Sequence, residues 1–292
     1  MKLLKLPEFF SLMAGVALCA CAAQTASSQP PIADSSMAGD QAASELREHH
    51  RHHHLGGVTQ FIAMSIDTLG IDDARLAQVD QLRSSLHVCM APAGAVANKL
   101  LLAFADGAAS GAIDTAKVDA TVDQLNSAAA SVPGCSADAL NRLHALLLPT
   151  ERATLVDKVQ AHWEVWRQVN DEALGNGHEP GSQLAELGLE LSLTADQVAA
   201  IAQTLHTPLA ALAGRFDPNK AEAYVQAFTS AFGGEVFDAR SIAANATGPL
   251  ATHGSMRMAI FYENVAPLLT SKQRVTLAEH LREHASHQPQ IK

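Results

Sequence analysis

The stretch Leu269-Thr270-Ser271-Lys272-Gln273 and its counterpart Leu193-Thr194-Ala195-Asp196-Gln197 decide how this sequence is interpreted. In each, the threonine side chain can accept a hydrogen bond from the backbone N–H three residues on. The glutamine at that third position can accept one from the threonine's own N–H. This reciprocal arrangement is a capping box, so a helix is predicted to begin at each stretch.

Two degenerate copies occur earlier, at Ile71-Asp72-Asp73-Ala74-Arg75 and Leu147-Leu148-Pro149-Thr150-Glu151. Each keeps the apolar first residue but lacks the glutamine. The spacing within the two pairs is the same, 147 − 71 = 76 and 269 − 193 = 76, and the pairs are offset by 193 − 71 = 122. We therefore predict an internal duplication, with repeats at residues 59–174 and 182–287. The boxes are also expected to bring helix ends together at a shared surface.

The composition favours helices. Aromatic residues make up only 4% of the 292 residues, alanine is abundant, and no segment shows a convincing strand period. We therefore predict an all-α fold. Within it, Pro92 is expected to end or kink a helix, Gly107 and Gly111 are expected to break the next one, and Pro133-Gly134 is expected to turn the chain, whereas Pro149 suits the first turn of a helix.

The first 21 residues resemble a processing segment. Lys2 and Lys5 form a charged n-region, residues 9–18 form an apolar stretch, and Leu18-Cys19-Ala20-Cys21 fits the lipobox of bacterial lipoproteins. This predicts a lipoprotein signal peptide over residues 1–21, with lipidation of Cys21 as the membrane anchor. The alternative is ordinary cleavage just beyond, among small residues. Either route exports the protein, and a periplasmic location is expected; no later apolar run is expected to span a membrane.

Charge and cysteine usage narrow the class of partner. The formal net charge is −10, and removal of residues 1–21 makes it 18 − 29 = −11, so nucleic acid is not an expected partner. Cys89 and Cys135 are the cysteines that remain in the body of the chain. In an oxidising compartment they predict a disulfide that closes a loop of 135 − 89 = 46 residues. The alternative is two buried thiols.

Residues 22–58 are predicted to be a flexible tether that carries a histidine-rich segment. Dense imidazoles bind Zn²⁺, Ni²⁺ or Cu²⁺, although a solvated polar tract is an equal alternative. Near the C-terminus, two histidines four residues apart share one helical face and a third lies on an adjacent face; an exposed polar face is the alternative there. The candidate metal ligands are His49, His50, His52, His53, His54, His280, His284 and His287.

The run His280-Leu281-Arg282-Glu283-His284 also spells H-x-x-E-H, an inverted zinc-protease motif. Such enzymes take their third ligand from well downstream, whereas this sequence ends at Lys292. No other nucleophile, metalloprotease or phosphate-loop motif is present in the sequence. We therefore predict that the protein is not an enzyme and requires no cofactor.

Paired L-T-x-x-Q boxes in an exported, helical chain with a histidine-rich segment resemble the Spy/CpxP/ZraP family of periplasmic stress proteins. The resemblance covers roughly residues 49–287. It implies helical hairpins that form a cradle and bind unfolded envelope proteins without ATP. Members typically carry two boxes and form homodimers, so this chain resembles a fused pair, as one cradle or two lobes. The best-known chaperone of the family is basic, whereas this chain is acidic, so apolar contacts would carry more of the affinity.

The resemblance leaves three functions to distinguish. The first is a chaperone, with Met256, Met258 and Phe261 as candidate client contacts because methionine adapts to varied partners; ordinary core packing is the alternative for each residue. The second is a periplasmic protein that binds or senses a divalent metal through its histidines. The third is a regulator that docks on a sensor kinase.

Overall fold

The computed structural model describes residues 57–172, 182–213, 217–243 and 249–287. All of them belong to the unit Gln41–Lys292, which is distinct from the unit Met1–Asp40. These ranges contain ten α-helices, one short 3₁₀-helix and no strand, so the predicted all-α class is confirmed. The elements are α2 (Gly57–Ile66), α3 (Asp73–Ser110), α4 (Thr115–Leu146), α5 (Pro149–Glu172), α6 (Ser182–Glu190), α7 (Ala195–Ala213), α8 (Pro218–Gly233), α9 (Ala239–Ala243), α10 (Pro249–Val265), η1 (Ala266–Leu268) and α11 (Ser271–His287).

Helices α3 and α4 are longer than the sequence predicts. Both continue through a proline, so the expected helix end at Pro92 of α3 and the expected turn at Pro133 of α4 are wrong. The reason is tertiary: α3 and α4 form the most extensive helix–helix contact of the described structure, and the Cys89–Cys135 disulfide joins them beside both prolines, with 5.6 Å between its Cα atoms. Packing has overridden local propensity.

Helix α3 ends at Gly111 rather than at Gly107. Gly111 has φ of 88°, the left-handed conformation that suits glycine, and its N–H reaches the carbonyls of Gly107 and Ala108. Gly107 lies inside the helix, where an added Cβ would sit 2.8 Å from the Cα of Ile113. The role of Gly107 is therefore close packing of the following turn, and its predicted role as a helix breaker is wrong.

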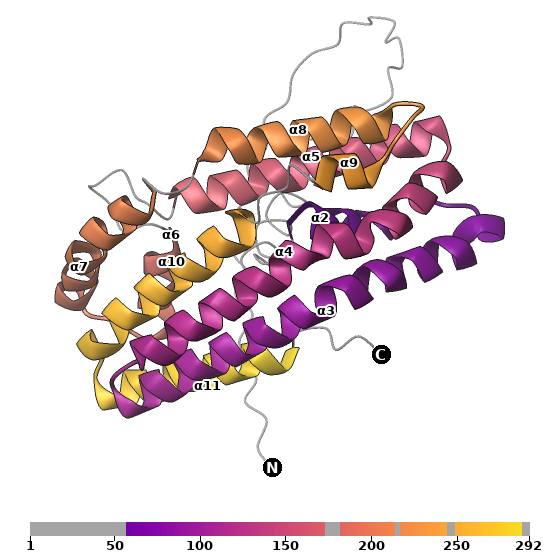
Figure 1. Ribbon diagram of the computed structural model, residues 1–292. Coiled ribbons are helices and arrows are strands. Elements are labelled where there is room, and N and C mark those ends of the chain that lie inside the picture. The colour runs from indigo at the N-terminus through magenta and orange to yellow at the C-terminus, as the bar shows by residue number, and fades with distance from the viewer. Residues whose placement is uncertain (1–56, 173–181, 214–216, 244–248, 288–292) are drawn as a thin grey trace, which may run out of the picture. The chain divides into compact units, whose positions relative to one another are not determined.

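The helix boundaries recur along the chain. Helices α3 and α5 begin at residues 73 and 149, and α7 and α11 begin 122 residues later, at 195 and 271. The single helix α3 corresponds at this offset to α7 and α8, and α4 corresponds to α9, α10 and η1. We call α3 to α5 the first half and α7 to α11 the second half. The last helix of each half packs on the other half: α11 lies along α3, and α5 lies against α8 (Figure 1).

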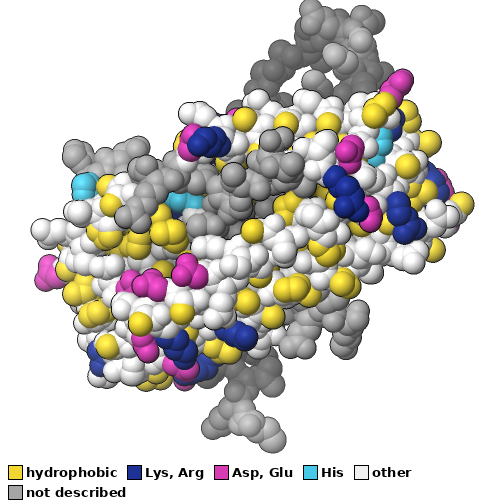
Figure 2. All heavy atoms as spheres, viewed as in Figure 1, with side chains coloured by type: hydrophobic (Ala, Val, Ile, Leu, Met, Phe, Trp, Pro, Cys, Tyr) yellow, Lys and Arg dark blue, Asp and Glu magenta, His cyan; other side chains and the backbone are white. Residues whose placement is uncertain are grey.

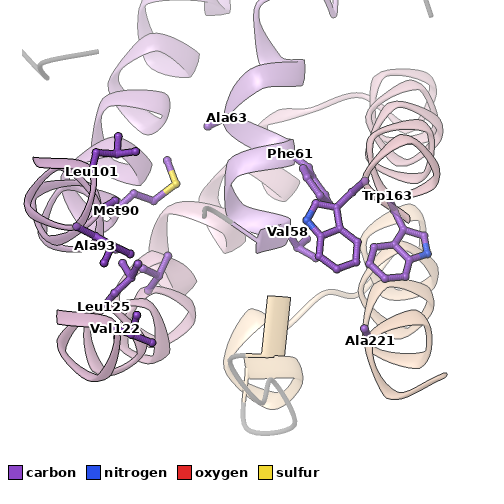
Figure 3. Close-up of a cluster of buried hydrophobic side chains, with 14 of the residues drawn as sticks. Val58, Phe61, Ala63, Met90, Ala93, Leu101, Val122, Leu125, Trp163 and Ala221 are labelled. Atoms are coloured by element: carbon purple, nitrogen blue, oxygen red, sulfur yellow. The ribbon is translucent and has the colours of Figure 1, made fainter. Parts of the chain in front are cut away.

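The hydrophobic core runs between these helices. Figure 3 shows Val58 and Phe61 of α2 directed toward Trp163 of α5, and Met90 and Ala93 of α3 facing Leu125 of α4. Trp163 stacks on Trp166 with 5.2 Å between ring centroids, and its indole N–H donates to the Glu222 carboxylate of α8. The fully buried large side chains include Phe104, Phe232, Ile62, Leu86, Leu100, Leu125, Leu143, Leu155 and Ile201.

Helix α3 is long and apolar enough, by length and composition, to cross a membrane, which the sequence did not lead us to expect. Its most apolar window has a mean hydropathy of 1.6, yet only 44% of that window is buried in the protein. Helices α2, α4 and α11 pack against α3. It is therefore a core helix by its contacts, but one that leaves much apolar surface uncovered.

Candidate functional site

Both predicted capping boxes are formed. The N–H of Gln197 donates to Thr194 Oγ1 at 3.2 Å, and the N–H of Thr194 donates to Gln197 Oε1 at 3.1 Å. The same two bonds join Gln273 and Thr270, at 3.3 and 2.9 Å. Helices α7 and α11 thus begin with two of their free N–H groups satisfied by side chains.

The two boxes also bind each other through their glutamines. Gln197 Nε2 donates to Gln273 Oε1 at 2.9 Å, and Gln273 Nε2 returns the bond to Gln197 Oε1 at 3.1 Å. The remaining amide protons go to backbone carbonyls, from Gln197 to Leu268 at 3.2 Å and from Gln273 to Leu191 at 3.4 Å. Each amide therefore uses its full hydrogen-bonding capacity, and the pair fastens the first turns of α7 and α11 together.

The degenerate boxes meet in the same way with different chemistry. Arg75 donates from both terminal nitrogens to the two carboxylate oxygens of Glu151, at 2.6 Å each. Glu151 accepts as well from the Leu148 N–H at 2.8 Å, which is its half of a capping box. Asp72 caps α3 by accepting from the Arg75 N–H at 3.1 Å, and its carboxylate also accepts from the Arg75 side chain.

The geometry of the Arg75–Glu151 pair determines its electrostatics. The Arg75 guanidinium holds the pKa of Glu151 below its usual range, through the paired hydrogen bonds, and does the same for Asp72. The two carboxylates raise the pKa of Arg75. The side chains of Arg75 and Glu151 are 18% and 12% exposed, so the pair is shielded more than an ordinary surface ion pair.

The two pairs occupy equivalent positions. Arg75 donates to the Leu146 carbonyl at 3.2 Å, as Gln197 does to that of Leu268, and the two bonds are related by 197 − 75 = 122 and 268 − 146 = 122. The loss of glutamine from the first two boxes is thus not a loss of the contact. The sequence predicted the caps and the meeting of the helix ends, but not which side chains join them; the equal spacing of 76 residues was the available signal.

Of the two arginines that follow the second box of each pair, Arg274 contacts the opposite half directly, and Arg152 lies beside a histidine that does. The Arg274 guanidinium lies against Gly111 at the end of α3, and its Nη1 donates to the Leu269 carbonyl at 3.2 Å. Arg152 Nη1 lies 3.1 Å from His144 Nε2, which in turn lies 3.0 Å from the Gly234 carbonyl at the end of α8. The capped helix ends therefore also carry contacts between the halves.

The candidate metal ligands are not assembled in the part of the chain that the structure covers. Residues 49–54 lie outside it, as do Cys21 and the rest of the predicted signal peptide and tether. His280 Nδ1 lies 3.6 Å from a carboxylate oxygen of Glu190, and the side chain of His287 is not described. Among the described residues no group of three or more histidine, cysteine, aspartate or glutamate side chains could hold a metal ion.

The residues proposed for client contact belong to the core. Phe261 is buried, and its ring meets Tyr262 edge-on with 5.3 Å between centroids. Met256 and Met258 are half-buried and pack against the core. Because α10 lies against α4 and α7, burial favours core packing for Phe261, while Met256 and Met258 keep part of their surface exposed.

A different apolar surface lies on α3 and α4. Residues 88–98 of α3 and 124–137 of α4 contain no Asp, Glu, Lys or Arg, and the Cys89–Cys135 disulfide sets these two segments side by side. We call their outward-facing part the uncharged band. It comprises exposed or half-exposed Val88, Ala91, Pro92, Gly94, Ala95, Val96, Asn98, Gln124, Asn126, Ser127, Ala128, Ala129, Ala130, Ser131, Pro133, Gly134 and Cys135. Figure 2 shows hydrophobic and uncharged side chains over the middle of these helices, with the charges toward the ends.

No family model, curated protein or solved structure matches this chain. The resemblance to the Spy/CpxP/ZraP family therefore stays a prediction from the boxes.

Proposed function

We propose that the protein is a non-enzymatic chaperone that binds unfolded proteins without ATP and uses the uncharged band of α3 and α4 as its contact surface. This is the function implied by the resemblance to the Spy/CpxP/ZraP family, assigned to a different surface from the one the sequence suggested. The observation that carries the proposal is the exposed, charge-free pair of helix faces in a chain of net charge −10.

The chemistry of the band suits unfolded clients. An unfolded chain exposes apolar side chains, and their transfer from water to an apolar surface lowers the free energy. Val88 is 62% exposed, and its neighbours on the band are mainly alanine and glycine. Small side chains let a bound segment approach closely, and the absence of charge means that no ion is desolvated on binding. An uncharged surface of this kind favours apolar segments of any sequence.

The charge of the rest of the chain supports the same role. Lys99 and Asp138 mark the edges of the band, and the net charge of −10 keeps copies of the protein apart in solution. An exposed apolar surface on a neutral protein would favour self-association. The acidic remainder thus allows the band to stay open for a client.

The disulfide and the duplication fit a periplasmic protein of this type. A disulfide persists in oxidising compartments, and Cys89–Cys135 joins the α3 and α4 segments of the band. Helix starts recur at an offset of 122 residues, and so do the hydrogen bonds from Arg75 and Gln197 to backbone carbonyls. This recurrence supports a fused pair of repeats, in which one polypeptide supplies what two protomers would supply. We propose export through the predicted signal peptide and anchoring at Cys21.

The test is light scattering from a chemically unfolded client that aggregates on dilution, in the presence of residues 22–292, with a chelator and without ATP. Suppression at a near-stoichiometric ratio is expected. Adding charge to the band in V88E/A95E and V88K/A95K should abolish suppression, because each client contact would then bury an ion. Both residues are exposed, so the fold should tolerate either pair.

The matched control is V236E. Val236 is 87% exposed and apolar, but it lies between α8 and α9, outside the band. This variant should suppress aggregation as the parent protein does. If the two band variants suppressed aggregation as well as the parent protein does, the band would not be the client surface. If the parent protein did not suppress aggregation, the chaperone function would be rejected.

A further inference from the structure

The two clamps of this protein share a geometry and differ in charge. Gln197 and Gln273 form a neutral pair in the second half, and Arg75 and Glu151 form an ion pair at the equivalent positions of the first half. Each pair joins the first turns of two helices whose starts are 76 residues apart, α7 with α11 and α3 with α5. Amide side chains do not titrate, whereas a carboxylate does.

Protonation of Glu151 would undo the ion pair in a specific way. The ionised carboxylate accepts two N–H bonds from Arg75 and one from the Leu148 backbone. A protonated carboxyl carries an O–H donor, which would face the guanidinium donors, and it no longer attracts the positive charge. The other charged group that faces this contact is Asp72, which pairs with Arg75 from the start of α3 and whose pKa Arg75 likewise lowers.

We propose that the Arg75–Glu151 pair is an acid-released clamp, so that acidification separates the first turns of α3 and α5 while the Gln197–Gln273 pair keeps α7 and α11 joined. The residues beneath the clamp are apolar: Leu147 is buried, and Ile71 packs against the core. Release therefore exposes apolar surface in the first half alone. The inference does not depend on the proposed chaperone function.

The direction of the pH effect follows from the pKa values. The pKa of Glu151 is lower in the folded protein than its ordinary value of about 4.3. The clamp is therefore fully present above that ordinary value and is lost as the pH falls through the lower, folded value. At neutral pH both clamps are closed.

The test is hydrogen–deuterium exchange between about pH 6 and about pH 3, corrected for the intrinsic rate, on peptides covering the first turns of α3, α5, α7 and α11. In the parent protein, exchange in α3 and α5 should rise toward acid, by more than in α7 and α11, because only the first clamp contains a carboxylate. Exchange in α7 and α11 should not change in the His253→Gln background, which removes the acid response of the buried His253 in α10. Circular dichroism at each pH establishes that the helices remain.

The matched variants place the side chains of one clamp at the equivalent positions of the other. R75Q/E151Q copies the neutral pair into the first half and should remove the acid response there, while Q197R/Q273E should transfer it to α7 and α11. D72N keeps a good cap but removes the second carboxylate, and it should retain the response of α5. E151Q alone removes the titrating carboxylate and leaves Arg75 paired with Asp72 only, so it should show faster exchange than the parent protein at the start of α5 at neutral pH and no further rise there toward acid.

Two results would overturn the proposal. One is an unchanged acid response of α3 and α5 in R75Q/E151Q, or in E151Q if the double variant does not fold. The other is an acid response in the parent protein that is equal in all four first turns, since that would be global unfolding rather than release of one clamp.

Discussion

The guanidinium of Arg274, at the start of α11, lies against Gly111, the residue that ends α3. A Cβ built on Gly111 would stand 3.0 Å from Arg274 Cζ, and the φ of Gly111 is 88°. Gly111 thus serves two purposes, a left-handed helix end and a close approach between the halves. A side chain at this position would disturb both.

Gly111→Ala should therefore destabilise the protein. The left-handed conformation costs a non-glycine residue about 1–2 kcal/mol, and displacement of Arg274 from Gly111 adds to that cost. Urea unfolding followed by circular dichroism measures the loss. Gly94→Ala is the control, because nothing lies within 4 Å of that added Cβ, and alanine favours the interior of α3. A G111A protein as stable as G94A would refute the assigned role of Gly111.

Removing either threonine cap should weaken the start of its helix. Thr194→Ala and Thr270→Ala each delete the hydroxyl that accepts from a glutamine N–H, at an expected cost of about 1 kcal/mol in the free energy of unfolding. Thr204→Ala is the control, because its hydroxyl bonds a carbonyl within α7 and caps nothing. If the three variants were equally stable in urea, the caps would not contribute as argued.

Loss of the disulfide should lower stability through the unfolded state. Replacing Cys89 and Cys135 by serine opens a loop of 46 residues, which corresponds to about 4 kcal/mol of loop entropy. The measurement compares urea unfolding of C89S/C135S with that of the parent protein, with and without a reductant. The reductant should lower the stability of the parent protein and leave the variant unchanged. A parent protein indifferent to reduction would contradict the prediction.

Acid should also destabilise the protein through His253. Burial, with a smaller effect from the Arg257 charge, lowers the pKa of this histidine to about 4, from an ordinary value of about 6.5. Because the unfolded chain binds a proton at higher pH than the folded one, stability should fall as the pH drops from about 6.5 to about 4.

The His253 effect is measured with thermal unfolding across that pH range. His253→Gln should flatten the pH dependence, whose full size is up to about 3 kcal/mol for a shift of this order. His206→Gln, on the exposed side of α7, should leave it unchanged. An unaltered slope in H253Q would mean that another group controls the acid response.

The sequence predicted well those features that depend on a few neighbouring residues. Thr194, Thr270 and Asp72 cap helices where the patterns placed them, because a cap is a contact between residues three apart. It failed where the outcome depends on distant partners. Pro92 was expected to end a helix, but contacts with α4 and the disulfide hold α3 continuous through it.

The candidate surfaces also depend on distant partners, which the sequence did not predict. Met256 and Phe261 were selected by residue type, yet burial is decided by which helix lies over them, and α10 presents them to the core. The uncharged band was visible in the sequence only as two runs without charge. Their meaning required the antiparallel contact of α3 and α4 that places one run beside the other.

The sequence by itself determined the helical class and the starts of the capped helices, because composition and local hydrogen bonding govern these, and it predicted the pairing of Cys89 with Cys135. Only the tertiary structure decided that Gln197 meets Gln273 and that Arg75 meets Glu151. Those contacts join residues 76 apart, and the chain between them must first fold before either pair can form. Their equivalence depends on packing between helices, which no local pattern encodes.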